Sequence, residues 1–326
     1  MNVDMRDKID AVTSKAPTIL GRTIAPCLNK KMKHEPARTS YGRSGSLEVS
    51  LATRKKEIKK AQQLRYKVFY KEMSAIPDTN SKLKRRDIDH YDKYCDHLIL
   101  IDHNASLKDK VKGEKPLFIP KKPKVVGTYR MLREDVAKEH GGFYTENEYD
   151  IKELLARKSN THKFLEVGRS CVLKTHRGKR SIEMLWQGLW TYICANKINV
   201  MIGCASFTGI NPREHALALS YLHHFHRAPK DWSARAHSNT YVDMNLMPKS
   251  DIDMKRALKA MPPLIKGYLR LGAFFADGAV IDRQFGTTDI MVILPVEVIS
   301  QRYLTHFGKP DKQISRLEQA AIPAFN

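Results

Sequence analysis

The chain has 326 residues, of which 57 are lysine or arginine and 35 are aspartate or glutamate, so its formal net charge is +22. This length and an apolar share of 42% allow one large domain or two modest ones with a sizeable core. No stretch approaches the roughly 18 apolar residues of a membrane span, and the N-terminus lacks the basic-then-apolar pattern of a signal peptide. Five cysteines without paired spacing (Cys27, Cys95, Cys171, Cys194 and Cys204) favour a reducing compartment without a metal site, and the protein is predicted to be cytoplasmic.

The positive charge predicts an anionic partner, which is a nucleic acid, an acidic protein or an anionic membrane face. The basic residues are dispersed in runs over 54–60, 82–86, 108–115 and 121–124, and most such runs are solvated faces. The sequence has no zinc-finger spacing, no aromatic RNA-binding signature and no convincing helix-turn-helix. No nucleic-acid partner is therefore expected.

The first 45 residues are polar and unpatterned, which predicts a basic, disordered N-terminal tail. Leu47–Ala52 alternates in polarity as a strand does. A helix is predicted over Arg54–Met73, with Thr53 as its N-cap. Its apolar residues recur at spacings of three and four, and Arg65 lies on or beside that apolar face, which is unusual for an arginine.

A polar, charged loop is predicted to follow Pro77 and to run through Asp92. The later elements are predicted from their apolar patterns: strands over His97–Ile101, Val125–Leu132, Phe164–Leu173, Val200–Phe207, Ala279–Ile281 and Asp289–Leu294, and helices over Ser181–Ala195, Pro212–His224 and Pro263–Leu271. A basic insertion over 104–122 decorates the hairpin of the first two of these strands. This order predicts an α/β fold with a mixed central sheet flanked by helices.

The run from Glu166 to Val172 places a carboxylate, a guanidinium, a hydroxyl and a thiol on a segment that reads as a buried strand. Unpaired charges are costly to bury, so Glu166 and Arg169 form either a buried ion pair without chemistry or part of a site. Their separation of three sends them to opposite faces of a regular strand. Either a bulge re-aims one of them, or only one faces a cleft, for which Glu166 is favoured.

Several motifs resemble the bacterial ornithine lipid N-acyltransferases of the GNAT superfamily. They occur in matching order over roughly 46–308: residues 61–73, 89–98, 126–130, 166–172, 185–189, 203–207, 262–268 and 277–282. The resemblance implies a GNAT-like acyl-CoA N-acyltransferase fold over 46–310, with a family-specific C-terminal extension and a tail over 311–326. It also implies transfer of a 3-hydroxyacyl chain from acyl carrier protein to the α-amine of ornithine, the first step of ornithine lipid biosynthesis.

More distantly, the chain resembles the acyl-homoserine lactone synthases. Their pattern of charged and aromatic positions is matched by Arg65, Phe69, Asp89, Asp92, Arg130, Glu166 and Arg169. The resemblance implies that these residues ring the acyl-transfer cleft.

Amide formation from a thioester requires a group that takes the proton of the amine, and Glu166 is the candidate base, directly or through water. Asp89 and Asp92 are candidates for the cationic substrate, although both could simply cap a turn. Arg130 and Arg169 are candidates for the substrate carboxylate or for pairing Glu166. Arg65 could instead be a scaffold residue paired with Glu72 or Asp96. Because GNAT-type transfer is direct, Ser170 and Cys171 are interpreted as packed residues rather than nucleophiles.

The turn before the long helix differs from that of the coenzyme A-dependent enzymes. Arg180 and Ile182 stand where a glycine and a small residue let backbone N–H groups hold a pyrophosphate. Acyl carrier protein presents a single phosphodiester on a strongly acidic surface. We therefore expect Arg177, Lys179 and Arg180 to steer acyl carrier protein to the cleft.

No metal or cofactor is expected beyond the acyl-acyl carrier protein donor. His97 and Asp102 match a pattern of glycerol-lipid acyltransferases but point to opposite faces of a strand, and His223, His224 and His226 are interpreted as a solvent-facing helix end. Two alternatives stay open: the same fold acylating another amino acid or making an acyl-homoserine lactone, and a non-catalytic basic binding module. Peripheral contact with the anionic inner face of the cell membrane is compatible with a lipid product.

Overall fold

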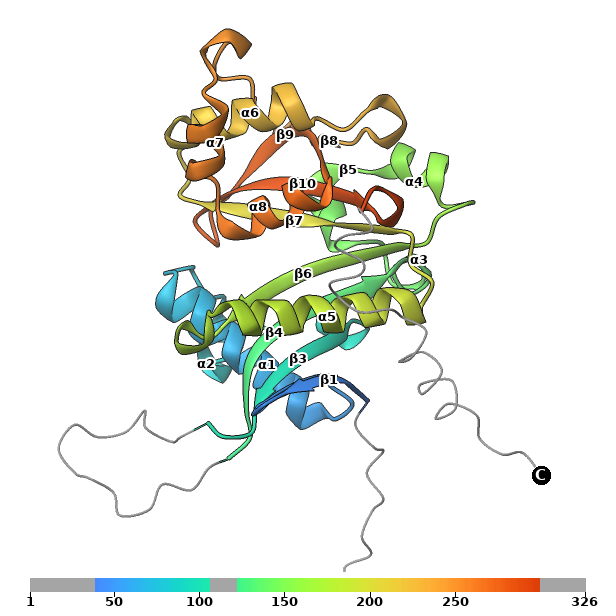
Figure 1. Ribbon diagram of the computed structural model, residues 1–326, viewed down its shortest axis with the longest axis vertical. Coiled ribbons are helices and arrows are strands. Elements are labelled where there is room, and N and C mark those ends of the chain that lie inside the picture. The colour runs from blue at the N-terminus through green and yellow to red at the C-terminus, as the bar shows by residue number, and fades with distance from the viewer. Residues whose placement is uncertain (1–38, 106–121, 300–326) are drawn as a thin grey trace, which may run out of the picture. The chain divides into compact units, whose positions relative to one another are not determined.

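The computed structural model describes residues 39–105 and 122–299, and ten strands within them form one mixed sheet (Figure 1). The strands are β1 (Ser40–Ser44), β2 (Leu47–Leu51), β3 (Asp96–Asp102), β4 (Lys124–Arg133), β5 (Tyr149–Asp150), β6 (Phe164–Val172), β7 (Val200–Thr208), β8 (Arg235–Ala236), β9 (Phe274–Asp282) and β10 (Thr287–Pro295). Their order across the sheet is β1-β2-β3-β4-β6-β7-β10-β9-β8-β5. Of the neighbouring pairs, β6–β7 and β8–β9 are parallel and the others are antiparallel.

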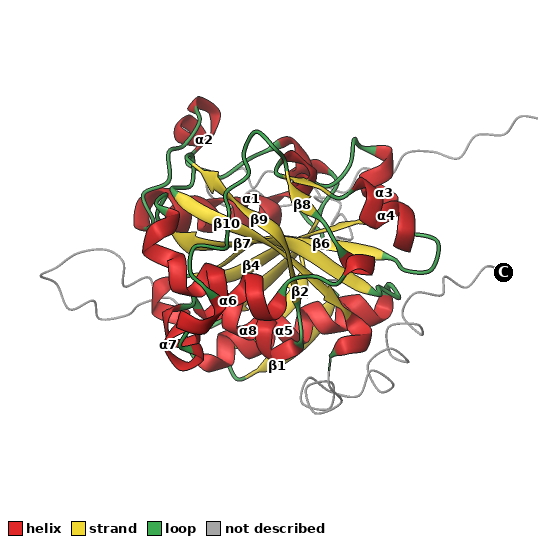
Figure 2. Ribbon diagram, turned by 90° about the horizontal axis from the view of Figure 1, so that it is seen from above, coloured by secondary structure: helices red, strands yellow, loops and turns green. Residues whose placement is uncertain are grey.

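Helices cover both faces of the sheet, and Figure 2 shows α5, α6 and α8 on one side of the strands with α1 and α3 on the other. The helices are α1 (Lys55–Tyr66), α2 (Thr79–Lys84), α3 (Glu134–Glu139), α4 (Lys152–Lys158), α5 (Lys179–Ala195), α6 (Ala216–His226), α7 (Met254–Ala260) and α8 (Pro263–Leu271). A π-helical turn over Lys67–Glu72 continues α1. Two 3₁₀ turns, His90–Lys93 and Tyr144–Asn147, carry residues of the site described below.

The long amphipathic helix α5 packs on one face of the sheet and contributes to the hydrophobic core. Its buried residues recur at helical spacing, and Met184, Leu185, Leu189 and Tyr192 belong to the main hydrophobic cluster. Gly188 lets the helix approach closely, because a Cβ at that position would overlap Val49 of β2 and press on Leu98 of β3.

The α/β fold with a mixed sheet between helices is confirmed, and the predicted strands and long helices all form. The structure also corrects the boundaries. Ser40–Ser44, assigned to the disordered tail, forms β1, and Thr79–Lys84, assigned to a loop, forms α2. The last predicted strand, Asp289–Leu294, is longer than expected, because Thr287, Thr288 and Pro295 also belong to β10. The remaining tail residues, 1–38 and 300–326, and most of the basic insertion, 106–121, lie outside the described residues.

Two further observations concern compartment and membrane. The four cysteines of the described residues are free thiols, and Cys27 lies outside that part. Within the described ranges, none of the helices has both the length and the apolar character that crossing a bilayer requires.

The sheet splits between β6 and β7. These parallel strands pair only from Phe164↔Val200 to Glu166↔Ile202. Beyond that point β6 stays paired with β4 and β7 stays paired with β10, so two half-sheets diverge in the middle of the molecule (Figure 1). Gly203 lies at the divergence, where a Cβ would overlap the carbonyl oxygen of Val167. The split leaves backbone N–H and C=O groups without a strand partner in the centre of the sheet.

Candidate active site

A β-bulge in β6 determines where Arg169 points. Gly168 pairs with Arg130 and Cys171 pairs with Thr128, so two residues of β6 oppose Tyr129 alone. Arg169 is the first residue of the bulge and has a φ of 51°, in the left-handed region that non-glycine residues rarely adopt. Of the two alternatives for Glu166 and Arg169, the structure therefore has the bulge. Backbone strain of this kind tends to persist where a side chain must be aimed.

Three arginines and three aspartates form a connected ionic network beside the split. Arg65 contacts Asp87 and Asp92, in each case at 2.7 Å. Arg130 contacts both carboxylate oxygens of Asp89 at 2.6 Å. Arg169 reaches Asp89 at 3.2 Å and Asp87 at 3.4 Å. The formal charges of the six side chains cancel, which is how a buried ionic cluster avoids the cost of unpaired charge.

Exposure divides this network into an inner and an outer part. The side chains of Arg65 and Asp92 are 0% and 4% exposed, whereas those of Asp89 and Arg169 are 21% and 14% exposed. The inner pair therefore holds the loop that follows α2 onto α1, and a substrate has access mainly to the outer pair. The expected scaffold partners of Arg65, Glu72 and Asp96, are wrong, because its partners are Asp87 and Asp92.

Asp89 caps a turn, which is one of the two functions that the sequence left open for it. Its carboxylate caps the 3₁₀ turn by accepting hydrogen bonds from the N–H groups of Tyr91, at 3.0 Å, and Asp92, at 3.2 Å. Burial raises the pKa of Asp89, but Arg130 and Arg169 outweigh that effect and hold it at about 2. Asp89 is therefore ionised at neutral pH.

Glu166 lies on β6 opposite Leu132 of β4 and is almost completely buried. Its carboxylate accepts hydrogen bonds from Tyr144 N at 2.9 Å, from Thr145 N at 2.6 Å and from the Thr145 hydroxyl. Burial raises the pKa of Glu166, and these hydrogen bonds and Arg130 only partly oppose the effect. Among the ion pairs of residues 39–105 and 122–299, none joins Glu166 to Arg169.

Aromatic rings enclose Arg169 and join the two half-sheets. Its guanidinium lies 4.8 Å from the ring centre of Tyr144 and 4.9 Å from that of Phe285, in the β9–β10 turn. Phe69, on the π-helical turn, meets Phe285 edge-on at 5.7 Å. Next to these rings, Ile76 N donates a hydrogen bond to Gln284 O, the residue before Phe285, at 2.7 Å.

The basic residues of the β6–α5 turn lie apart from the ionic network and make separate contacts. Arg177 pairs with Glu72 of the π-helical turn and donates to Val172 O at 3.0 Å. Arg180 donates to the Ser44 hydroxyl at 2.7 and 2.9 Å. Lys179 is 3.6 Å from Glu183, and its side chain is 88% exposed. Lys179 is therefore the freest of the three to meet a partner.

The two histidine patterns that were not interpreted as catalytic or metal-binding do not bring their members together in the structure. His97 bonds to Asp92 O at 3.2 Å and Asp102 bonds to His176 at 3.2 Å. His224 and His226 bond to different groups, Met247 O and the Tyr221 hydroxyl. Burial raises the pKa of Cys171 to about 12, so its thiol is protonated at neutral pH.

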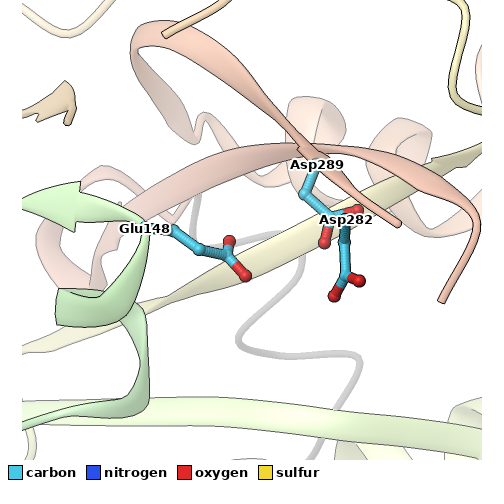
Figure 3. A group of neighbouring side chains, drawn as sticks. All are labelled: Glu148, Asp282 and Asp289. Carbon is cyan, nitrogen blue, oxygen red and sulfur yellow. The ribbon is translucent and has the colours of Figure 1, made fainter. Parts of the chain in front are cut away.

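Several site residues were not predicted from the sequence. They are Asp87, Tyr144, Thr145, Phe285 and the three carboxylates drawn in Figure 3, Glu148, Asp282 and Asp289. One signal was available for Asp289, because it is a charge in an apolar strand, as Glu166 is. Asp87 is two residues before Asp89, so the Asp-x-Asp pattern was a second available signal. The other residues lie in turns or at strand ends, where the sequence has no pattern.

Comparison with known proteins gives consistent results. Residues 64–187 match the family model described as an acetyltransferase (GNAT) domain. The chain is 48% identical over 267 residues to an L-ornithine N(alpha)-acyltransferase of Brucella abortus (strain 2308), covering 82% of this chain and 90% of that protein. It is 46% identical over 279 residues to a protein of the same name from Rhizobium meliloti (strain 1021), covering 86% and 90%.

Among solved structures, the chain is similar to an N-acyl amino acid synthase from uncultured soil microbes. The identity is 11% and the TM-score is 0.40, with 77% of this chain and 91% of that chain covered. The family model that matches and the sheet order together confirm the predicted GNAT fold.

Proposed function

Because the chain belongs to the family of L-ornithine N(alpha)-acyltransferases and is an acyltransferase, we propose that it acylates the α-amine of ornithine. In this proposal the donor is a 3-hydroxyacyl chain on acyl carrier protein, and the product is lyso-ornithine lipid. The reaction is the first step of ornithine lipid biosynthesis and requires no bound cofactor.

The split between β6 and β7 is the observation that carries this proposal. It leaves backbone N–H groups without a strand partner at the centre of the sheet, on the strand that carries Arg169 of the outer pair. A thioester carbonyl placed there would find donors for the oxyanion that develops during attack. Arg169, held between two rings, would receive the carboxylate of the amino acid.

The proposed chemistry is a direct transfer in which atoms balance without an acyl-enzyme. The α-ammonium of the acceptor loses a proton to Glu166, acting through water, and the free amine attacks the thioester carbon. A C–N bond forms, the C–S bond breaks, and the second amine proton goes to the departing pantetheine sulfur. The raised pKa of Glu166 supports its role as base, because a weakly basic carboxylate would take the proton less well.

We also propose that Arg177, Lys179 and Arg180 guide acyl carrier protein to the split. The turn that carries them joins β6 to α5 and contacts the π-helical turn through Arg177 and Glu72. Side chains at 180 and 182 suit a single phosphodiester better than a pyrophosphate. The net charge of +22 supports the further proposal that the enzyme acts in the cytoplasm at the anionic inner face of the membrane, where a lipid product would be released.

A matrix of donors and acceptors tests the proposed function. Purified enzyme is incubated with 3-hydroxyacyl carrier protein or the matching coenzyme A thioester and with one of several amino acids, and products are resolved by mass. We expect acyl-ornithine from the carrier protein and at most weak turnover from coenzyme A. Turnover only with another amine would replace the acceptor, and turnover only from coenzyme A would replace the donor. No turnover with any pair would contradict the proposal.

A further inference from the structure

Three carboxylates from separate parts of the chain meet on the other side of the split from the ionic network. Glu148 precedes β5, Asp282 ends β9 and Asp289 lies in β10, and Figure 3 shows their carboxylates gathered together. One oxygen of each lies within 4.8 Å of an oxygen of the others. Asp289 pairs with Ser206 of β7, four residues beyond the Glu166↔Ile202 pair. The strand registers therefore put Asp289 and Glu166 on the same face of the sheet, about 13 Å apart along β7.

No ion pair neutralises this acidic cluster within the described residues, although the Arg169 guanidinium lowers the pKa of Glu148 and of Asp289 from a distance. None of its members has an ion-pair partner among residues 39–105 and 122–299, in contrast to the six side chains of the ionic network, Arg169 included. Asp282 uses one oxygen to accept from the N–H groups of Gln284 and Phe285 at 2.8 and 2.9 Å. Asp289 is only 6% exposed, yet its Oδ1 has no hydrogen-bond partner, and neither does Glu148 Oε2.

Burial and mutual repulsion act on the cluster in the absence of a cation. Burial raises the pKa of Glu148 to about 7, with Asp289 as the next contributor. Burial likewise raises the pKa of Asp289 to about 6, although the neighbouring Ser206 and Thr287 oppose the effect. Both groups therefore titrate near neutral pH, and a bound cation would favour their ionised forms.

We propose that Glu148, Asp282 and Asp289 bind the side-chain ammonium of the acceptor amino acid and so select a diamino acid. This inference rests on the proposed function, which supplies an acceptor with a carboxylate, a reacting amine and a second amine. The carboxylate lies at Arg169, the reacting amine at the split, and the second amine at the cluster.

The chemistry of the proposed acceptor favours an ammonium over a metal ion at this cluster. An ammonium has three N–H donors, and the cluster offers three carboxylates. Tetrahedral N–H···O bonds of about 2.8 Å separate the accepting oxygens by about 4.6 Å, a separation that the cluster allows because its three oxygens lie within 4.8 Å of one another. Magnesium at about 2.1 Å would draw neighbouring oxygens to about 3 Å and would require further ligands.

Selectivity follows from the cost of leaving the cluster empty. When an acceptor without a side-chain amine binds, the carboxylates stay buried without a cationic partner. A site of this kind therefore rejects an analogue that lacks the amine. Norvaline is the matched probe, because it is ornithine without the side-chain amine. At pH 8 we expect the wild-type enzyme to prefer ornithine by at least about 100-fold in kcat/KM. The preference should shrink towards pH 6 as the cluster takes up protons.

The test compares Asp289→Asn and Glu148→Gln with the wild type and with Glu214→Gln, an exposed control near the end of β7. We expect Asp289→Asn to lower kcat/KM for ornithine by about 100-fold while leaving norvaline unchanged or improved, and the control to match the wild type. Equal losses with both acceptors would overturn the proposal, because they would indicate a structural role. Glu148→Gln, at a less buried position, repeats the comparison if the first variant folds poorly.

Direct binding separates this inference from the proposed function. Titration calorimetry with ornithine, norvaline and MgCl₂ needs no acyl donor. Binding of ornithine that is lost in Asp289→Asn supports the ammonium site even if no donor yields turnover. Binding of Mg²⁺ that depends on Asp289, with ornithine affinity unaffected by the variant, would overturn the proposal in favour of a metal site.

Discussion

The guanidinium of Arg169 lies over the ring of Phe285, and this contact links β6 to the β9–β10 turn across the split sheet. The two residues are far apart in the sequence and belong to different half-sheets, which separate after Glu166 and Ile202. The bulge that gives Arg169 its positive φ directs the side chain to this ring. The contact therefore joins the two half-sheets at the candidate site.

Replacing Phe285 tests this link. Phe285→Ala removes a face for Arg169 and the edge-on contact with Phe69, so we expect the free energy of unfolding to fall by about 1–2 kcal/mol. Because Arg169 is then less well oriented, KM for the amino acid should rise by about tenfold. Urea unfolding and steady-state kinetics measure the two effects. Phe285→Leu, which keeps apolar volume without a ring face, should recover stability but not KM; full recovery of both would contradict the role of the ring.

Asp289→Asn should stabilise the free enzyme in a pH-dependent manner. The pKa of Asp289 is about 6 in the folded protein and near 3.8 when unfolded, so the folded state binds the extra proton. The favourable contribution of this proton to the stability of the folded state is complete below pH 3.8 and is lost as the pH rises through 6. The variant should therefore gain stability over the wild type between pH 4 and 7, on the order of 3 kcal/mol, and should keep that gain at higher pH. Urea unfolding from pH 4.5 to 8 measures the difference, and a difference independent of pH would contradict an ionised, unpaired Asp289.

The sequence was sufficient for the elements with a strong apolar period. Helix α5 and the paired strands β6 and β7 carry long patterns, so their positions were predicted within a few residues. The short elements β5 and β8 span two residues each and leave no period to read. Strand β1 is polar on its exposed side and was assigned to the tail, although pairing with β2 orders it.

The site was predictable only in part, for a related reason. The charged motif residues could be identified because charges are unusual in apolar segments, but their partners depend on the tertiary fold. Arg65 binds Asp87 and Asp92, which follow a helix that the sequence does not reveal. Glu166 is held by Tyr144 and Thr145, residues of a turn without a pattern. The odd spacing of Glu166 and Arg169 indicated a bulge as one alternative but not which residue it would turn.

Glu166→Gln tests the proposed base. The amide cannot accept the proton, so we expect kcat to fall by about 1,000-fold and the acid limb of the pH–rate profile to disappear. Thr145→Val is the matched control, because it removes one hydrogen bond to the carboxylate and leaves the carboxylate in place. It should raise the pKa of that limb with only a small loss of rate. If both variants lose rate equally and keep the limb, Glu166 serves to position Tyr144 and Thr145 instead.

Charge reversal in the β6–α5 turn tests the recognition of acyl carrier protein. Lys179→Glu is the cleanest change, because that side chain is largely exposed, whereas reversing Arg177 would also break its pair with Glu72. We expect KM for acyl carrier protein to rise by about three- to tenfold at low salt and the effect to vanish near 0.5 M, where exposed charges are screened. Lys152→Glu, on α4, controls for the change in net charge. An increase that is the same in both variants would mean that the protein's overall charge, and not this turn, attracts the carrier.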